Sequence, residues 1–449
     1  MSISLILLFQ LLCVTTINSS NIKLPDPKPK EFYQYNNSNT EKIWIDYNFE
    51  DSFRSKYKKF IQHFATNDLA NHGRKIPFEI CNSLENQEIS QKQKQILLNN
   101  KGSYAIIKKD FKIVIYSMDD DGVLNGLVTL NNLMVENQQN IGDFLIVDWP
   151  DFSARIFHVV LKSVSYDEIE KLVIKIRKKN YNHLIGQLTN YNLDLTKWGL
   201  NDILKLKNLC DGLGIEFIPE VKLLSHQEKF FKNKYPELMY NSYTYNPEHP
   251  LTKKKVNEFL SNLILEIRPK IIHVGHDEII GVYDKFKNKK KLKISEYPLP
   301  AKSFKSSILF LYNLLNSQNI EMWMWGDMFL DQSKYSNMFK WSLHGNNEYE
   351  KVLFQIPMDI TIIDWHYFDK GEKFPSYDFF KNNGFKTFGA TWKNLRVTRN
   401  FSNYIAQSNA KNSGMVATTW FLLQKQDWES INQIIEFSGN SFWNSDYTK

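Results

Sequence analysis

Short apolar runs alternate with amphipathic segments of helical period from Arg155 onward, and this alternation limits the fold more than any other feature. Strands that are connected through helices build a parallel sheet. We predict eight strands, at residues 156–161, 183–188, 216–221, 271–274, 322–325, 360–364, 387–391 and 415–420. Helices are predicted between them, for example at 167–178, 202–213, 254–267, 304–316 and 404–411. Eight strands in about 270 residues predict a (β/α)8 barrel. A doubly wound sheet is ranked below it, because no glycine-rich phosphate loop follows the first strand.

A different pattern precedes the barrel. Strands are predicted at 43–47, 76–80, 103–108 and 113–117, and helices at 53–65 and 122–135. Leucines recur at helical spacing in the second helix, so one of its faces is apolar. We therefore predict a small α+β domain over residues 21–148, with one amphipathic helix covering a sheet, and a barrel domain over 149–449. Residues 119–122 (DDDG) predict a turn and helix cap rather than a calcium loop, which needs more alternating ligands.

The amino-terminal residues 2–16 (SISLILLFQLLCVTT) are apolar and are followed by a polar stretch. Their apolar core is short for a membrane span and fits a secretory signal, so we expect residues 1–20 to be a signal peptide and the chain to be exported. An uncleaved anchor is the alternative. No other run approaches the roughly 18 apolar residues of a spanning helix, so no stable membrane span is expected.

Composition argues against several functional classes. The net charge of +7 is spread over lysine-rich segments without a basic stripe between aromatics, so nucleic-acid binding is not expected. Cys81 and Cys210 fall in different predicted domains, which argues against a cysteine metal site and against a disulfide framework. Aromatic residues make up 14% of the chain. They suit large cores, but Trp and Tyr also line sugar clefts, where apolar pyranose faces stack on rings.

The segment KIIHVGHDE, residues 270–278, is the strongest candidate for a functional site. Its apolar, β-branched run predicts a buried strand that stops at Gly275. Asp277 and Glu278 follow, at the strand end where barrels place their chemistry. An acidic pair alone can be structural: residues 167–168 open a predicted helix, where its dipole favours acids. Asp277 and Glu278 differ because they follow a strand and a glycine.

Polar and aromatic residues also follow the other predicted strands. A single Trp in an apolar run usually belongs to a core. Several Trp and Tyr residues at the same end of different strands, around two carboxylates, predict an aromatic cup with acids at its floor, which is typical of a sugar-cleaving pocket. The residues are Lys162, His226, Trp325, Asp327, Asp364, Trp365, His366, Tyr367, Trp392 and Trp420.

These segments resemble glycoside hydrolase family 20, the β-N-acetylhexosaminidases, and within it the hexosaminidase D-type branch. HVGHDE (273–278) matches H-x-G-x-D-E, MWGDMF (324–329) is similar to W-D-D-M, and IIDWHY (362–367) to a W-x-Y strand end. IPEVKLLSH (218–226) is similar to I-P-x-x-Q-x-x-G-H, and HVVLKS (158–163) to H-L-D-L-K-G. The resemblance covers nearly the whole mature chain, including the α+β domain before the barrel.

The resemblance implies a retaining exo-β-N-acetylhexosaminidase that hydrolyses terminal β-linked GlcNAc or GalNAc with the help of the substrate's own acetamido group. It implies Glu278 as the general acid and base, and Asp277 as the residue that orients the acetamido group. It implies a glycan as the substrate and neither a metal nor an organic cofactor; the oligomeric state is unknown. The remaining site residues that it implies are His226, His273, Trp325, Asp327, Trp365, Tyr367 and Trp420.

The sequence departs from the family pattern at several positions. Val160 stands where the branch has an aspartate, and Ser163 and Ser225 replace glycines. Asn190 lies where the branch has an acidic pair, and the family's sugar-binding arginine has no match eight residues after Arg155. These departures concern the binding of sugar hydroxyls. A non-catalytic carbohydrate-binding relative is therefore the alternative function, and a structural surface protein is the third.

Overall fold

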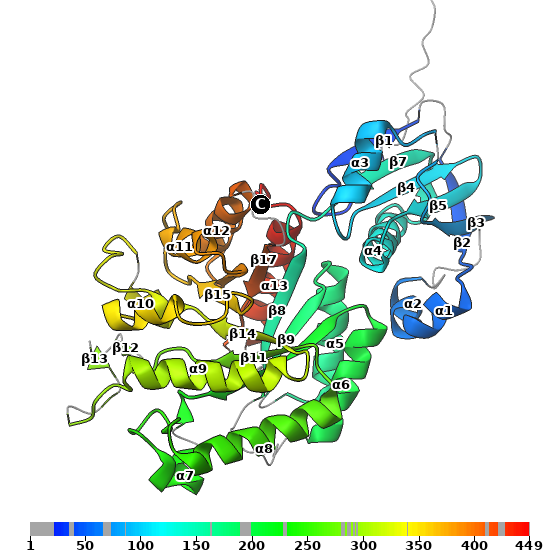
Figure 1. Ribbon diagram of the computed structural model, residues 1–449. Helices are drawn as coiled ribbons and strands as arrows, with labels where there is room; N and C mark the ends of the chain where they lie inside the picture. The colour runs from blue at the N-terminus through cyan, green and yellow to red at the C-terminus, as the bar shows by residue number, and fades with distance from the viewer. Residues whose placement is uncertain are drawn as a thin grey trace, which may run out of the picture.

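The computed structural model shows a closed barrel and a second, seven-stranded sheet (Figure 1). It describes residues 22–35, 40–65, 73–85, 87–161, 164–188, 199–227, 231–279, 292, 295–338, 340–408, 413–420 and 427–448, and the short strands β12 (Tyr283–Asp284) and β13 (Lys289–Lys290). The expected signal peptide, Lys162, Ser163 and Asn190 lie outside the described residues. Within these ranges, no helix is long and apolar enough to cross a membrane.

Eight parallel strands close into the predicted barrel, in the order β8, β9, β10, β11, β14, β15, β16 and β17. They are β8 (Ala154–Leu161), β9 (His183–Leu188), β10 (Glu216–Leu223), β11 (Ile271–Gly275), β14 (Glu321–Trp325), β15 (Thr361–Trp365), β16 (Thr387–Thr391) and β17 (Gly414–Ala417). The prediction was wrong about the end of the last strand. β17 stops at Ala417 and not at Trp420, although the backbone amides of Thr418 and Thr419 still donate hydrogen bonds to the neighbouring strands, at Thr391 and His158.

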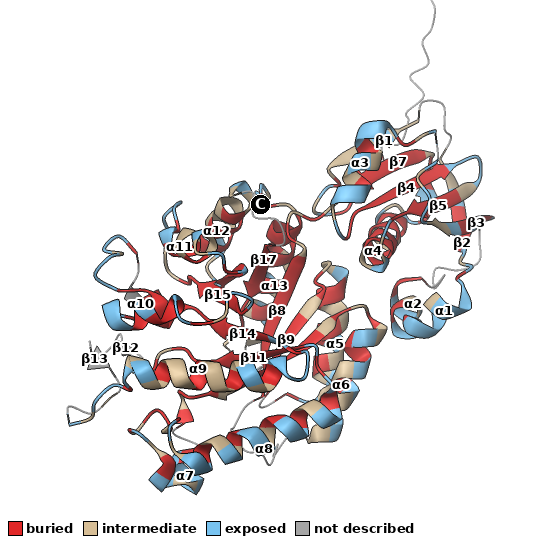
Figure 2. Ribbon diagram, viewed as in Figure 1, coloured by how far each residue is buried: buried red, intermediate tan, exposed pale blue. Residues whose placement is uncertain are grey.

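The barrel strands are mostly apolar, as expected of strands whose two faces are both buried (Figure 2). In β8 every residue is buried. Phe157 and Val159 belong to the core between the barrel and its helices, whereas Ile156 belongs to the core inside the barrel. Because successive side chains of a strand point to opposite faces, one apolar run contributes residues to both cores.

Helices cover the outside of the barrel. They are α5 (Tyr166–Lys178), α6 (Leu200–Gly212), α7 (Phe231–Lys234), α8 (Pro250–Ile267), α9 (Ala301–Asn316), α10 (Asn347–Leu353), α11 (Pro375–Asn382), α12 (Leu395–Gln407) and α13 (Trp428–Trp443). Ser165 and Glu168 form a capping box at α5, so the acidic pair at 167–168 is structural, as expected. The helix predicted at 404–411 was misplaced: α12 begins at Leu395, after its cap Asn394.

The other sheet has the strand order β1, β7, β4, β5, β3, β2, β6. Its strands are β1 (Glu31–Gln34), β2 (Glu41–Asp46), β3 (Arg74–Cys81), β4 (Tyr104–Lys109), β5 (Lys112–Tyr116), β6 (Asn140–Ile141) and β7 (Phe144–Asp148). The helices of this region are α1 (Asp51–Lys56), α2 (Lys58–Phe64), α3 (Gln91–Asn99) and α4 (Asp120–Glu136). The single helix predicted at 53–65 is therefore two helices, which meet at Tyr57.

Helices lie on both faces of this sheet. Leu127 and Leu130 of α4 are fully buried in the main core, as the leucine spacing predicted. The expectation of one covering helix was incomplete, because Leu97 of α3 packs with Ile107 and Leu145 in a separate core on the other face. The predicted cap is confirmed, since the Asp119 carboxylate accepts a hydrogen bond from the amide of Gly122 at 2.8 Å.

Asp121, in the first turn of α4, joins the sheet domain to the barrel. Its Oδ2 accepts hydrogen bonds from Nη2 of Arg155 at 3.1 Å and from Nδ2 of Asn182 at 3.0 Å. Arg177 lies 3.9 Å from the other oxygen. Burial raises the pKa of Asp121, but the two arginines outweigh it and hold the pKa below its usual value. The two units therefore share a buried ionic contact.

Candidate active site

The turn after β11 directs two carboxylates into the barrel mouth. Gly275 has φ +75°, and a Cβ there would lie 3.3 Å from the Cα of Lys222, so both the conformation and the space favour glycine. His276 and Glu278 also have positive φ, of 69° and 51°, which is uncommon for such residues and marks a constrained turn. His276 points away from the mouth, toward α9, where its Nε2 lies 3.0 Å from the hydroxyl of Ser307.

Asp277 and Glu278 line a cavity of about 230 Å³ at the carboxyl end of the barrel. Most of its wall is aromatic. Its lining residues are Lys222, His226, Asp277, Glu278, Trp325, Trp341, His344, Trp365, Tyr367, Phe368, Trp392 and Trp420. The predicted site residues thus come together here, except that His273 and Asp327 are not among the lining residues and are almost fully buried.

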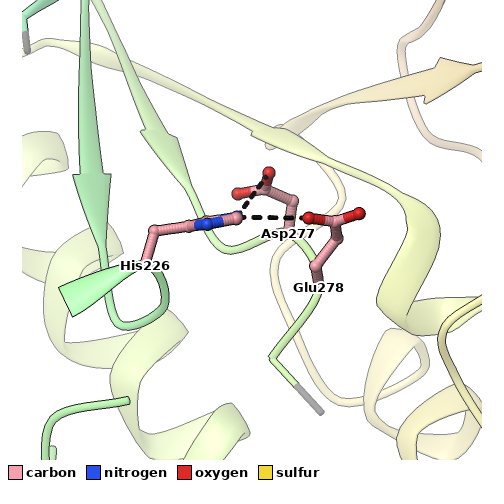
Figure 3. A group of neighbouring side chains, drawn as sticks. All are labelled: His226, Asp277 and Glu278. Atoms are coloured by element: carbon pink, nitrogen blue, oxygen red, sulfur yellow. Dashed lines mark hydrogen bonds and ion pairs between the residues drawn. The ribbon is translucent and has the colours of Figure 1, made fainter. Parts of the chain in front are cut away.

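His226 lies between the two carboxylates (Figure 3). Its Nε2 is 3.2 Å from Oδ2 of Asp277 and 3.4 Å from Oε2 of Glu278. The hydroxyl of Tyr243 contacts the other ring nitrogen, Nδ1. His226 itself has φ +57°, so the loop after β10 holds the imidazole in a constrained position. The contacts of both ring nitrogens fix its orientation.

The two adjacent carboxyls have pKa values that move in opposite directions. Burial raises the pKa of Asp277, but His226 and Lys222 outweigh it and keep the pKa well below its usual value. Burial also raises the pKa of Glu278, and there the neighbouring His344 and His226 do not cancel it, so the pKa stays above its usual value. One group is therefore a lasting anion, and the other holds a proton to higher pH. Such pairs commonly divide acid and anion roles in catalysis.

Asp327 fixes the turn from below. Its Oδ2 accepts a hydrogen bond of 2.8 Å from the backbone amide of Glu278, and its Oδ1 accepts one of 3.2 Å from the indole of Trp365. His344 contacts the same carboxylate at 3.1 Å and lies 3.7 Å from Oε1 of Glu278. Asp327 thus links the proton-carrying residue, one aromatic wall and a histidine.

A buried layer of one carboxylate and two histidines lies next to the cavity. Glu220 is fully buried, and its Oε1 accepts a hydrogen bond from Nε1 of Trp325 at 3.2 Å. Its Oε2 lies 2.8 Å from Nε2 of His158, within hydrogen-bond distance. Burial raises its pKa, but His158 and His273 outweigh this and bring the pKa to about 2. Burial lowers the pKa of His273 to about 4. His273 packs its ring 4.6 Å from Trp325, so it supports the floor and does not touch the cavity.

The wall at β15 combines inward aromatics with an outward ionic cluster. Trp365 and Tyr367 stack at 4.8 Å. His366, between them, is fully buried and lies 3.1 Å from Asp364 and 2.8 Å from Asp369. Burial lowers its pKa, but the two carboxylates outweigh it and raise the pKa to about 9. A buried charged histidine therefore anchors the strand end that carries two cavity residues.

Several residues in or next to the cavity were not predicted from the sequence. Lys222 and Glu220 lie on β10, but the pairing of β10 with β11 shifts register between Glu220 and Leu223, so the period of a strand could not have placed Lys222. Trp341 and His344 lie in the loop after β14, beyond its strand end, where no local pattern marks them. Tyr243 is likewise brought in by the long loop after β10.

Three of the residues that line the cavity also offer ligand atoms for a metal. One atom each of His226, Asp277 and Glu278 lie within 4.8 Å of one another. The same atoms form the hydrogen-bonded and ionic contacts already described, and burial raises the pKa of Glu278, which disfavours the free carboxylate that a metal needs. We therefore interpret the group as an acid–base arrangement.

Comparisons with solved structures identify the fold. A β-N-acetylhexosaminidase from Bacteroides fragilis aligns with a TM-score of 0.63 at 13% identity, over 95% of this chain and 92% of that one. The N-acetyl-β-hexosaminidase of Streptomyces plicatus aligns with a TM-score of 0.66 at 11% identity, over 94% and 91%. A Flavobacterium johnsoniae chitobiase of family 20 aligns with a TM-score of 0.64 at 16% identity, over 94% and 69%.

These similarities confirm the predicted fold, a (β/α)8 barrel preceded by a sheet domain, as that of glycoside hydrolase family 20. At such identities the likeness concerns the fold. No protein-family model and no curated protein sequence matched the chain. The D-type branch stays a prediction.

Proposed function

We propose that this chain is a retaining exo-β-N-acetylhexosaminidase that removes terminal β-linked GlcNAc or GalNAc from glycans. The observation that carries the proposal is the pair Asp277 and Glu278 at the floor of an aromatic cavity, with pKa values displaced in opposite directions. The fold is that of solved β-N-acetylhexosaminidases, which supports the same activity.

The adjacency of the two acids determines the mechanism. Retaining glycosidases with a protein nucleophile place two carboxyls about 5 to 5.5 Å apart across the bond, and family 20 is a known exception that uses the substrate's acetamido group. Neighbouring side chains on one turn cannot straddle a pyranose. In the proposed first step the acetamido oxygen forms a bond to the anomeric carbon as the glycosidic bond breaks, and Glu278 gives its proton to the leaving oxygen.

In the second step water adds to the anomeric carbon and the oxazolinium ring opens. Glu278 accepts the proton of that water, which restores the starting state. Asp277 stays ionised, accepts a hydrogen bond from the acetamido N–H and offsets the positive charge of the intermediate. Its Oδ1 is buried and has no hydrogen-bond partner among the described residues, so an acceptor is available for that N–H.

The other cavity residues hold the sugar. We assign Tyr367 as the donor to the acetamido oxygen, and Trp325, Trp365 and Trp420 as the surfaces against which the pyranose packs. His226, His273 and Asp327 are positioning residues, because their contacts are with the carboxylates, the floor and the turn. We also propose that the chain is exported through its amino-terminal signal; amino-terminal sequencing of the secreted protein tests this.

The test is hydrolysis of aryl β-GlcNAc and β-GalNAc substrates by the wild type, Glu278→Gln and Asp277→Asn. Each variant should lose about 10² to 10⁴ in kcat/KM, the usual contribution of general acid–base catalysis. Glu372→Gln is the matched control, since this exposed acid lies in the loop after β15 on the same side of the barrel. A thiazoline mimic of the oxazoline intermediate should inhibit the wild type, and EDTA should not.

The results separate the candidate functions. No turnover on either sugar, with the thiazoline still raising the melting temperature, would favour the carbohydrate-binding alternative. Neither turnover nor stabilisation would favour a structural protein. Loss of activity in EDTA with recovery on Zn²⁺ would instead assign His226, Asp277 and Glu278 to a metal.

A further inference from the structure

Lys222 lies near the carboxyl end of β10 and lines the cavity. Its Nζ lies 5.2 Å from the ring of Trp420, which follows β17. Strands β9 and β8 lie between β10 and β17 in the closed barrel. The side chains of Lys222 and Trp420 thus meet above these two strands, and both line the cavity.

The charge of Lys222 is not matched by an ion pair in the described part of the chain. The nearby carboxylates pair with histidines instead: Glu220 with His158 at 2.8 Å and Asp277 with His226 at 3.2 Å. Lys222 does lower the pKa of both acids, so they share one electrostatic environment. Its ammonium nevertheless keeps its hydrogen-bonding capacity for an occupant of the cavity.

The strand level below Lys222 contains one carboxylate, which already has partners, and one amide donor, which has none among the described residues. Val160, Gln187 and Glu220 form one level across β8, β9 and β10. Val160 has no polar group, and Nε2 of Gln187 is a buried donor without a partner among the described residues. Apart from Asp277 and Glu278, the described residues that line the cavity include no carboxylate.

A neutral sugar ring presents hydroxyls, each of which needs an acceptor as well as a donor. A lysine has three donors and no acceptor, so it matches oxygen atoms that already carry negative charge. Hydrogen bonds between an ammonium and an anionic oxygen are roughly twice as strong as neutral ones, and the apolar surroundings of Trp420 strengthen them further.

We propose that the sugar in this cavity carries an anionic ester, a sulfate or a phosphate on a ring hydroxyl, and that Lys222 is the residue that selects it. This inference rests on the proposed function for its reaction, but its binding part stands alone. Lys222 is then a specificity-determining residue, which acts on the substituent, while Asp277 and Glu278 act at the anomeric carbon.

The experiment compares three substrates: 4-nitrophenyl N-acetyl-β-glucosaminide, its 6-sulfate and its 6-phosphate. The wild type should prefer at least one ester over the neutral sugar by about tenfold or more in kcat/KM, as expected of one charge-assisted hydrogen bond. Rising ionic strength should reduce this preference. Lys222→Met keeps most of the stem beside Trp420 and removes the charge, so the ester-to-neutral ratio should fall about 10- to 100-fold.

Lys393→Met is the matched control. The Lys393 ammonium lies 4.6 Å from the ring of Trp392, another cavity residue, but Lys393 is exposed and does not line the cavity. Its substitution should leave the ester-to-neutral ratio unchanged. Lys222→Gln serves as a second variant if the methionine variant does not fold, and the wild-type ratio and its salt dependence decide the question without any variant.

Binding separates this inference from the proposed function. GlcNAc 6-sulfate or GlcNAc 6-phosphate should raise the wild-type melting temperature more than GlcNAc does, and this excess should vanish in Lys222→Met. Hydrolysis of the neutral sugar with no preference for either ester overturns the inference and leaves the proposed function intact. No hydrolysis, with a Lys222-dependent stabilisation by an ester, overturns the function and supports the inference. If there is neither hydrolysis nor stabilisation by an ester, both the inference and the proposed function are overturned.

Discussion

The backbone amide of Glu278 donates a 2.8 Å hydrogen bond to the carboxylate of Asp327, so a residue from the loop after β14 holds the turn after β11. Asp327→Asn should remove one acceptor, because an amide cannot accept from both Glu278 and Trp365. We expect a loss of about 10² in kcat, since small displacements of catalytic groups have effects of this size. The pKa of Glu278 should also fall without the Asp327 charge. Because Glu278 must be protonated, the alkaline limb of the pH profile should then move to lower pH.

The measurement is the pH dependence of kcat/KM for wild type and Asp327→Asn. Asp331→Asn is the control, because Asp331 lies in the same loop and its carboxylate bonds to Ser333 away from the cavity. An unchanged alkaline limb in Asp327→Asn would show that Asp327 does not act on Glu278.

His226→Gln should move the whole pH profile to higher pH. Burial raises the pKa values of Asp277 and Glu278, and His226 lowers both. Without it, both pKa values rise. Asp277 must be ionised, so the acid limb of the profile moves to higher pH. Glu278 must be protonated, so the alkaline limb also moves to higher pH. His249→Gln, outside the cavity, should leave both limbs in place, whereas limbs that move in opposite directions would contradict this account.

Asp121→Ala should destabilise the protein by about 3 to 5 kcal/mol, because it leaves the buried arginines Arg155 and Arg177 without their carboxylate. The neighbouring Asp120 provides a matched control. It pairs with Lys56 at the surface, so Asp120→Ala should cost less than about 1 kcal/mol. Thermal unfolding of the two variants measures the difference. Equal losses would mean that the junction between the domains contributes little.

His366 should make stability depend on pH. Its pKa is about 9 in the folded protein and about 6.5 when unfolded, so its contribution is fully present below pH 6.5 and is lost as pH rises through 9. The shift corresponds to about 3 kcal/mol. His366→Asn should therefore lower the melting temperature more at pH 6 than at pH 10. The control is His63→Asn, because partial burial lowers the pKa of His63, so this substitution should not lower the melting temperature more at pH 6 than at pH 10.

The barrel could be predicted from the sequence because each strand is a local apolar run and each helix has its own period. Those signals are independent of distant contacts, and β9 and β16 have the predicted bounds. Errors arose where local signals were weak. In α3, five polar residues precede Ile96, Leu97 and Leu98, so the segment has no helical period of apolar residues, although Ser90 and Gln93 form a capping box that could have marked its start.

The candidate site was predictable where chemistry follows a strand directly, as at Asp277, Glu278 and Tyr367. His344 was not, because tertiary contacts with Asp327 bring it to the cavity. The acidic run at residues 119–121 shows the same limit. Its capping role was visible in the sequence, but nothing local could show that Asp121 contacts arginines of the barrel.

The buried layer of Glu220, His158 and His273 lies behind Trp325, which lines the cavity, so that side of the cavity is filled by packed side chains. A molecule that enters such a dead end must back out along the path by which it came. Under the proposed function, only a chain terminus would reach the acids, and cleavage would proceed one unit at a time. Each released sugar would then obstruct the next chain end until it departs, so we expect the product to inhibit the reaction.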